Sequence, residues 1–505
     1  MSHDMHKFRQ LVRRMCRIPV LRPFCNLANR IGGEIRRHGL AGFCARLPYY
    51  LRNSRTYLRQ LSAAPPAGEA RLFAAPSTGL RKLRLHPDLA DATESIDASV
   101  TIVIPTLNAG HEFPWLLRKL KEQQGLRCVE IVIVDSGSHD ATVAHARAAG
   151  CTVVEIAPAD FSHSHARNTG ADAATGDYLL FMVQDAYPIG SYWLCGMLRY
   201  LLDHATDNLA AVSCAEYSRS DSDAMYDSII HNHYRFLGCL EQDRIGEFKG
   251  EDHTLLRSYG QLSDVACLIR RTLFLSYRYR GSYAEDLDLG IRLIRDGHRV
   301  AMLASIKVIH SHNRPAYYYL KRSFVDTIHL VGLFDDYICP RVESAAGLVA
   351  GIASTAAHLS AWLAERNQAR SRPLAEWIRE WRRSFAEIRL DGSSRLGDER
   401  LDAFIIALAA RQPAPTRKLD GTGRREARTF VDAFMARLEH FEAFFSDVYP
   451  RQDQQVLADA RGAACKSFAA TAGSQLGYLY LALCRTDGPG REFAEALKAE
   501  LQAGI

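Results

Sequence analysis

The 505-residue sequence lacks several patterns that mark whole classes of protein. No Cys-x-x-Cys pair occurs among its 12 cysteines, which disfavours a zinc ribbon or a thioredoxin-like site. Twelve cysteines are also too few for a disulfide scaffold in a chain of this length, so reduced thiols in a cytosol are expected. No Gly-x-Gly-x-x-Gly follows the first predicted strand, where Thr106-Leu107-Asn108-Ala109-Gly110 stands, and this argues against a dinucleotide oxidoreductase.

Long hydrophobic runs are scarce as well. The stretch 345–363 has 19 residues without Asp, Glu, Lys or Arg, but its small and polar residues favour a buried or interfacial helix over a membrane span. The composition is 47% hydrophobic and 24% charged, which excludes a disordered chain, a collagen-like fibre and a polytopic membrane protein.

Acidic residues are scarce in the first 60 positions. This segment holds 13 lysines and arginines but only Asp4 and Glu34, a net charge of +11, so the other residues sum to −5. Arginines interrupt every apolar run, which excludes a secretory signal peptide, and the spacing predicts short amphipathic helices. Such basic helices suit an anionic membrane surface. One alternative is a helical pair packed on the globular part of the chain. Another is nucleic-acid binding, although no recognised nucleic-acid-binding module accompanies the charge.

Composition divides the chain into four predicted parts. A stretch rich in alanine, proline, glycine and serine near 62–79 is typical of a boundary. We predict a basic helical arm (1–61), a linker (62–98), an α/β domain (99–335) and a helical C-terminal region (336–505). In the last region the patterns predict helices at 373–390 and 426–448, a flexible loop at 420–425, and two helices in 454–502 broken at 487–490.

Apolar β-branched runs alternate with helical patterns from residue 100 onward. Such runs are typical of buried parallel strands, and the spacing of leucines between them predicts crossover helices. This βαβαβ order predicts a doubly wound α/β sheet whose ligands bind beyond the carboxyl ends of the strands. The predicted strands are 100–104, 130–134, 152–156, 178–183 and 301–309, with helices at 113–124 and 140–149.

Polar residues follow the first two predicted strands and are expected at one mouth of the sheet: Thr106, Asn108, Asp135, Ser136 and Ser138. Asp185 follows the strand 178–183, where an aspartate either caps a turn or acts as a metal or phosphate-side carboxylate. Glu285 and Asp286 begin an apolar helical stripe, where they either cap the helix or supply a general base.

Two histidines follow the predicted strand 301–309 directly. His310 and His312 are two residues apart, and in an extended segment such residues point to opposite faces. Only one of the two imidazoles is therefore expected to face a site.

The order of these motifs resembles the family 2 inverting glycosyltransferases of the GT-A fold, over about residues 99–330. Val183 stands where that family has the first acid of its DxD motif, so Asp185 alone is kept there. The motifs that carry the resemblance are Val103-Ile104-Pro105-Thr106-Leu107-Asn108, Ile133-Val134-Asp135-Ser136-Gly137-Ser138-His139-Asp140, Ala166-Arg167-Asn168-Thr169-Gly170, Gln184-Asp185-Ala186, Glu285-Asp286 and His310-Ser311-His312-Asn313.

The resemblance implies roles for these residues. Asp286 is the expected catalytic base with Glu285 beside it, and Asp185 the expected ligand of Mg²⁺ or Mn²⁺, with His310 or His312 as a candidate nitrogen ligand. Asp135 is expected on the base of the donor, and Arg167 on its diphosphate, in a loop. The implied nucleotide-sugar site comprises Pro105, Thr106, Asn108, Asp135, Ser136, Ser138, Arg167, Gln184 and Asp185.

The segments 161–168, 184–186 and 284–290 look most like rhamnosyltransferases of surface polysaccharide synthesis. The implied activity (class EC 2.4) moves a sugar, with rhamnose the first candidate, from a dTDP-, UDP- or GDP-sugar to a hydroxyl of a growing surface glycan or lipid-linked acceptor. The arm would hold the enzyme on the inner face of the cytoplasmic membrane. One alternative is a non-catalytic sugar-nucleotide-binding or scaffold protein, which the reduced DxD leaves open; a glycoside hydrolase is disfavoured by the nucleotide-type motifs.

Overall fold

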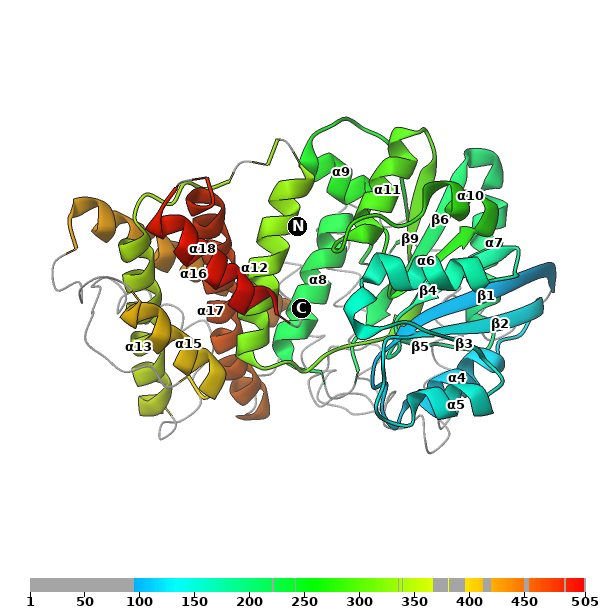
Figure 1. The fold of residues 1–505 in the computed structure, drawn as a ribbon, viewed down its shortest axis with the longest axis horizontal. Coiled ribbons are helices and arrows are strands. Elements are labelled where there is room, and N and C mark those ends of the chain that lie inside the picture. The colour runs from blue at the N-terminus through cyan, green and yellow to red at the C-terminus, as the bar shows by residue number, and fades with distance from the viewer. Residues whose placement is uncertain are drawn as a thin grey trace, which may run out of the picture. The chain divides into compact units, whose positions relative to one another are not determined.

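The computed structural model describes residues 95–219, 222–240, 242–334, 336–337, 339–366, 380, 396–411, 419–448, 454–485 and 487–503, all within one compact unit (Figure 1). The predicted arm at 1–61, most of the predicted linker, and the predicted helix at 373–390 except for Glu380 lie outside the described residues.

Nine strands of the described chain form one mixed sheet in the order β3-β2-β1-β4-β8-β6-β9-β5, with β7 paired to β9. Strands β1 (Ile96–Thr106), β2 (Leu126–Asp135), β3 (Thr152–Glu155) and β4 (Tyr178–Met182) are parallel. Strand β8 (Ala266–Arg270) is antiparallel to β4 and to β6 (Leu209–Tyr217), and β9 (Arg299–Ile309) is parallel to β6. The short strands β5 (Tyr187–Pro188) and β7 (Arg244–Gly246) pair antiparallel with β9. The predicted α/β class is confirmed, and the sheet is mixed because β8, β5 and β7 pair antiparallel with their neighbours.

This topology brings several strand ends to one edge of the sheet. Strands β1, β2 and β4 run the same way, and two antiparallel steps through β8 restore that direction in β6 and β9. The carboxyl ends of these five strands therefore share an edge with the amino end of β8. Side chains at that edge meet although they come from distant parts of the sequence.

Helices cover the sheet on its apolar faces. The face that bears Val103, Val132 and Phe181 is packed by α6, α10 and α11. The helix α6 approaches β1 closely because Gly170 has no side chain: a Cβ there would lie 2.3 Å from Cγ1 of Val103. The helices of this part are α4 (Phe113–Lys121), α5 (Thr142–Ala148), α6 (His163–Ala173), α7 (Trp193–Asp203), α8 (Ala224–Leu237), α9 (His253–Gly260), α10 (Arg271–Tyr277) and α11 (Glu285–Arg295), with short 3₁₀ turns at Pro158–Asp160 and Ala205–Asp207.

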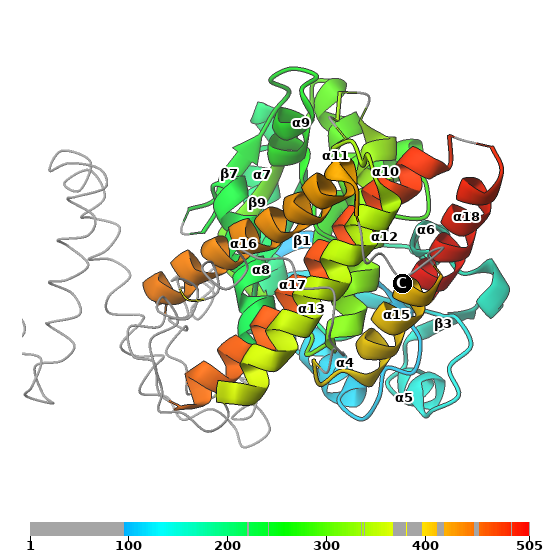
Figure 2. The ribbon, with the colours of Figure 1, turned by 90° about the vertical axis from the view of Figure 1, so that its left-hand side faces the viewer.

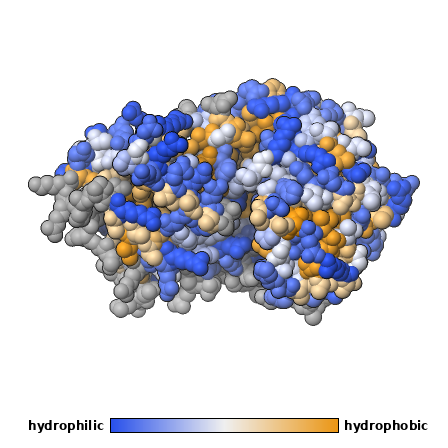
Figure 3. Space-filling model, in the orientation of Figure 1, coloured by the Kyte–Doolittle hydropathy of each residue, from blue (hydrophilic) through white to orange (hydrophobic). Residues whose placement is uncertain are grey.

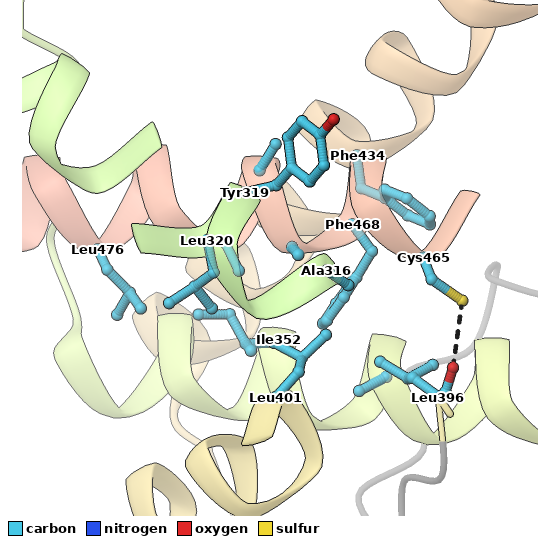
Figure 4. Packing of buried hydrophobic residues seen from close by; sticks show 14 of the residues in the cluster. Ala316, Tyr319, Leu320, Ile352, Leu396, Leu401, Phe434, Cys465, Phe468 and Leu476 are labelled. Atoms are coloured by element: carbon cyan, nitrogen blue, oxygen red, sulfur yellow. Dashed lines mark hydrogen bonds between the residues drawn. The ribbon is translucent and has the colours of Figure 1, made fainter. Parts of the chain in front are cut away.

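The rest of the described chain is helical, as predicted (Figure 2). Its helices are α12 (Ala316–Leu333), α13 (Ala345–Arg366), α15 (Glu399–Ala410), α16 (Gly421–Val448), α17 (Gln454–Leu483) and α18 (Pro489–Gln502). They bury a shared apolar cluster, in which Phe468 of α17 meets Phe434 of α16 at 5.8 Å between ring centres (Figure 4). Tyr319 and Leu320 of α12 belong to the same cluster, so α12 packs with the helical region although it lies inside the predicted domain 99–335.

Several predicted boundaries need correction. The predicted loop at 420–425 is the start of α16, because Asp420 Oδ1 accepts a hydrogen bond from the amide of Gly423 at 2.7 Å and so caps the helix. The strand β1 begins at Ile96, inside the predicted linker. The two helices predicted in 454–502, broken near 487–490, are confirmed as α17 and α18.

Within the described residues, we find no helix long and apolar enough to cross a membrane. The stretch 345–363 forms most of α13, where Leu348, Ile352 and Leu359 are buried against the other helices, so its apolar character serves packing. Figure 3 shows one face of the molecule, on which hydrophobic areas are interspersed with hydrophilic side chains.

Candidate active site

The loops that follow β1 and β2 are tied to each other by hydrogen bonds. Thr106 Oγ1 donates to Asp135 Oδ2 at 2.8 Å, and the amide of Asn108 donates to Ser138 Oγ at 2.8 Å. Ser136 donates to the carbonyl of Thr106 from both its amide and its hydroxyl, at 3.0 Å each. The structure thus brings together the polar residues predicted at this mouth, directly after Pro105 in β1.

Asp135 is buried beneath these loops. Its carboxylate accepts from the hydroxyls of Thr106 and Ser138 and from the amides of Gly137 and Ser138, at 2.6 to 3.1 Å. Burial alone would raise the pKa of Asp135, but these hydrogen bonds outweigh it and hold the pKa below its usual value. Both oxygens are used within the protein, so this carboxylate holds the loop, and its contact with a donor base stays a prediction.

Gln184 joins the loop after β4 to the loop after β1. Its side-chain amide accepts from the backbone amide of Leu107 at 2.9 Å and donates to the carbonyl of the same residue at 3.2 Å. Asp185, the next residue, is thereby placed beside the two nucleotide-type loops.

Asp185, His310 and His312 form a candidate metal cluster. One ligand atom from each lies within 4.8 Å of the others, and each imidazole has a nitrogen 3.5 Å from an oxygen of Asp185. Nε2 of His310 is buried and has no hydrogen-bond partner among the described residues, although it points toward these two groups. A buried nitrogen without a partner is costly unless it binds something, and a set of one carboxylate and two imidazoles suits a divalent transition-metal ion, so that Mn²⁺ fits it better than Mg²⁺.

The expectation that only one of the two histidines faces a site was wrong. The rings of His310 and His312 lie 4.6 Å apart, and both approach Asp185. The chain leaves β9 after Ile309, so these residues do not follow the alternation of a strand.

Glu216, at the end of β6, fixes the orientation of His310. Its Oε2 lies 2.6 Å from Nδ1 of His310, while Tyr226 and Tyr234 donate hydrogen bonds to the two carboxylate oxygens. A carboxylate on one ring nitrogen leaves the other free for a metal, an arrangement typical of metal-bound histidines.

The charges of the cluster follow from burial and from its two carboxylates. Burial lowers the pKa of His310, but Asp185 and Glu216 outweigh it and raise that pKa to about 10. Burial lowers the pKa of His312 to about 4, which leaves its lone pair available. Because a metal binds neutral imidazole, a cation must displace the proton of His310, and affinity is expected to rise with pH.

Glu285 and Asp286 open helix α11, as predicted. The preceding residue, Ala284, has left-handed backbone angles (φ 53°, ψ 35°), which turn the chain sharply into the helix. Asp286 is partly exposed, and its carboxylate accepts from the amides of Leu287 at 2.8 Å and Asp264 at 3.4 Å. Burial and the neighbouring Glu285 raise the pKa of Asp286 to about 6.

Arg167 lies under these carboxylates. Its Nη1 is 2.7 Å from Glu285 Oε1 and its Nε is 3.3 Å from Asp264 Oδ2, and all three side chains are buried. Burial raises the pKa of Asp264 well above its usual value, despite the opposing effect of Arg167. Because the guanidinium of Arg167 is already paired with Glu285 and Asp264, its contact with a diphosphate stays a prediction.

One further expectation near this site needs correction. The motif 166–170 lies inside helix α6, and not in a loop. Tyr187 and Trp193, which follow Asp185 in the sequence, are buried and pack in the core.

Sequence reasoning missed Glu216 and Asp264. Glu216 follows seven buried residues at the end of β6, the same signal that drew attention to Asp185 after β4. Asp264 precedes the buried strand β8 by two residues. Strands β6 and β8 contain alanine and cysteine where a typical strand has β-branched residues. Neither strand was therefore predicted, and Glu216 and Asp264 beside them were not recognised.

Comparisons with known proteins bear on the class of protein to which this domain is similar. The family model for glycosyl transferase family 2 matches residues 101–276. The stretch 101–276 therefore matches a family 2 glycosyltransferase domain, and this match together with the glycosyltransferase names of the curated relatives supports a transferase of class EC 2.4.

Among curated proteins, the chain is 27% identical over 219 residues to the O-antigen chain rhamnosyltransferase RfbN of Salmonella typhimurium, covering 42% of this chain and 67% of that one. It is 26% identical over 217 residues to the amylovoran biosynthesis glycosyltransferase AmsB of Erwinia amylovora, covering 41% and 68%. The matched relatives thus share less than half of this chain.

Among solved structures, the mannosyltransferase PcManGT from Pyrobaculum calidifontis, in complex with GDP-Man and Mn²⁺, has a TM-score of 0.37 at 15% identity and covers 87% of this chain and 97% of that one. Residues 1–349 of TarS from S. aureus give a TM-score of 0.33 at 16% identity, with 46% and 64% covered. The fold assignment rests on the sheet order and the family match.

Proposed function

We propose that this enzyme transfers a sugar, with rhamnose the first candidate, from a nucleotide-diphosphate donor to a hydroxyl of a growing surface glycan or glycolipid, with inversion. The observation that carries the proposal is a partly exposed Asp286, with its pKa raised to about 6, at the sheet edge that also holds Asp185, His310 and His312. The names of the curated relatives support the substrate class.

Asp286 is the proposed base. Its ionised carboxylate takes the proton of the acceptor hydroxyl as that oxygen bonds to the anomeric carbon, while the bond to the diphosphate breaks on the opposite face and the leaving group keeps the electron pair. Glu285, paired with Arg167, keeps a second negative charge beside Asp286 and thereby keeps the base basic near neutral pH.

Asp185, His310 and His312 are the proposed holders of a divalent cation, with Glu216 behind His310. These residues would hold Mg²⁺ or Mn²⁺, which would supply positive charge against the charge that develops on the departing diphosphate. The residues proposed to line the nucleotide side are Pro105, Thr106, Asn108, Asp135, Ser136, Ser138, Arg167, Gln184 and Asp185.

The place of action is proposed from the charge pattern. Residues 1–60 carry a net charge of +11 on a chain whose remainder sums to −5. A basic segment of this kind favours the anionic inner face of the cytoplasmic membrane, where a lipid-linked acceptor would be presented.

Replacing Asp286 by asparagine tests the base. Because asparagine cannot accept the proton, the rate of sugar transfer is expected to fall by about 10²–10⁴-fold. The matched control is Asp288→Asn in the same helical turn, whose carboxylate pairs with Arg292 at 2.8 Å and is expected to be dispensable for the chemistry. If D286N transfers sugar as fast as the wild type, Asp286 is not the base; if wild-type protein binds donors but never transfers, the scaffold alternative holds.

The donor is tested by thermal stabilisation. A ligand at 100 times its Kd stabilises the folded state by about 2.7 kcal/mol, so the true donor should raise the melting temperature. We expect dTDP-rhamnose to do so in the presence of Mn²⁺. A shift with a UDP- or GDP-sugar and none with dTDP-rhamnose would reject rhamnose transfer while leaving the enzyme class intact.

A further inference from the structure

Tyr283, two residues before Glu285, is held by three residues of α12. Its hydroxyl donates to the carboxylate of Asp326. The guanidinium carbon of Arg322 lies 4.9 Å from the centre of the tyrosine ring, and the ring of His329 stacks on it at 4.8 Å with planes 23° apart. These three partners are four and three residues apart along α12, so they share one face of the helix.

The turn between Tyr283 and the carboxylates is strained. Ala284 has φ 53°, a left-handed conformation that costs a residue with a Cβ roughly 1–2 kcal/mol. Such a conformation persists only where the surroundings impose it. After the turn, the carbonyl of Ala284 accepts a hydrogen bond from the amide of Asp288 at 3.0 Å, the first such bond of α11. Before the turn, Tyr283 is anchored to α12.

We propose that Tyr283 is a positioning residue for sugar transfer: its anchorage to α12 imposes the turn at Ala284 that presents Glu285 and Asp286. The inference rests on the proposed role of Asp286 as base. Tyr283 takes no proton and contacts no reacting atom; it acts through the backbone of the next residue.

The anchor is itself held by the helical C-terminal region. A Cβ at Gly473 of α17 would lie 2.0 Å from the carbonyl oxygen of Leu320 in α12, so the two helices cross at backbone contact. Leu320 and Phe468 belong to one buried cluster around that crossing (Figure 4). The helical region thereby contributes to the reaction indirectly, because it fixes the position of the face of α12 that contacts Tyr283.

Replacing Tyr283 by phenylalanine tests the proposal. The ring keeps its contacts with Arg322 and His329, and only the hydrogen bond to Asp326 is lost. We expect kcat to fall about tenfold, because small displacements of a catalytic group have large effects on rate, while KM for the donor stays within about twofold. A looser turn also admits water to Asp286, so the acidic limb of the pH profile should move to lower pH.

The matched control is Tyr277→Phe. Tyr277 donates to Asp296 Oδ2 at 2.6 Å at the opposite end of α11, so this variant loses the same kind of bond without touching the turn at Ala284. Its kcat and pH profile should equal those of the wild type. Asp326→Asn, which keeps an acceptor for the Tyr283 hydroxyl, should lie between the wild type and Y283F.

Two outcomes overturn the proposal. One is a Y283F enzyme with wild-type kcat and pH profile. The other is a rate that falls only with the folded fraction of Y283F or D326N while the pH profile stays in place, which marks a structural role alone. If D286N remains active, the proposed base fails instead; an inactive D286N beside a fully active Y283F rejects only the role of Tyr283.

Discussion

Asp286 gives the enzyme a pH dependence that its sequence position alone does not dictate. Because only the ionised carboxylate accepts a proton, kcat/KM should rise about tenfold per pH unit below a pKa of about 6 and level off above it. Initial rates measured from pH 5 to 8 test this rise of kcat/KM on the acidic side. Mn²⁺ is kept saturating, so that changes in cation binding with pH do not affect the rates. A pH profile that is flat across that range would contradict the assignment of Asp286 as the base. The residual activity of D286N should lack the rise of kcat/KM below pH 6.

Glu216 should tune the affinity for the cation. Removing its charge frees the ring of His310, and the loss of such a supporting carboxylate typically weakens metal binding by about 10–100-fold. Calorimetric titration of Glu216→Gln with Mn²⁺ measures the change. Glu130→Gln is the matched control, because Glu130 on β2 is a partly buried glutamate that accepts hydrogen bonds from Thr101 and Thr175, away from the cluster. Equal affinity in E216Q and the wild type would remove Glu216 from the site.

Single residues were predictable where a local pattern marks them. Asp185 lies in the loop just after an apolar strand and Glu285 opens a helix, and both positions are visible within a few residues of sequence. The partner of Arg167 was not predictable, because Glu285 lies 118 positions away and only the sheet topology brings the two together. That pairing gives Arg167 a buried counter-charge role that the sequence did not predict, and its contact with the diphosphate stays a prediction.

At the scale of elements, the crossing of α12 and α17 depends on one missing side chain. Gly473→Ala places a Cβ against the carbonyl of Leu320, and such overpacking should lower the free energy of unfolding by about 1–3 kcal/mol. Gly462→Ala on the same helix is the control: nothing lies within 4 Å of its added Cβ, so helix propensity should stabilise it by about 1 kcal/mol. Urea denaturation of both variants measures the free energy of unfolding. A G473A protein as stable as the wild type would show that α12 and α17 can move apart without loss of stability.

The elements that carry strong periodicity were predictable, and the alanine-rich ones were not. Strands β1, β2 and β4 are β-branched or leucine-rich runs, whereas β6 (LAAVSCAEY) and β8 (ACLIR) have no such run and lay in a stretch without an assignment. Their pairing with β4 and β9 turns a parallel sheet into a mixed one. Helix α16 begins at Gly421, before the predicted start at 426, because Asp420 caps the helix in a stretch whose glycines predict a loop.

At the scale of the molecule, the helical region is connected to the candidate metal cluster as well as to the proposed base. Lys466 of α17 pairs with Asp223 at 2.7 Å, and the amide of Asp223 donates to Oδ1 of Asn313 at 2.9 Å. Asn313 directly follows His312. Helix α17 therefore holds the loop that carries the two histidines through Asp223, which lies 243 positions before Lys466 in the sequence. No local sequence pattern predicts such a contact, which is why the helical region carried no chemical signal on its own.

The N-terminal arm should decide where the enzyme works. Each lysine or arginine near an anionic surface contributes about 1 kcal/mol, and residues 1–60 hold 13 of them against two acids, whereas the remaining chain is net negative. The full chain should therefore sediment with phosphatidylglycerol vesicles at low salt, release as salt is raised, and ignore phosphatidylcholine vesicles. Deleting residues 1–60 should abolish the binding while leaving transfer to a water-soluble acceptor unchanged. If the truncated chain bound anionic vesicles as well as the full one, the attraction would have to come from the body, and the arm would be assigned to packing.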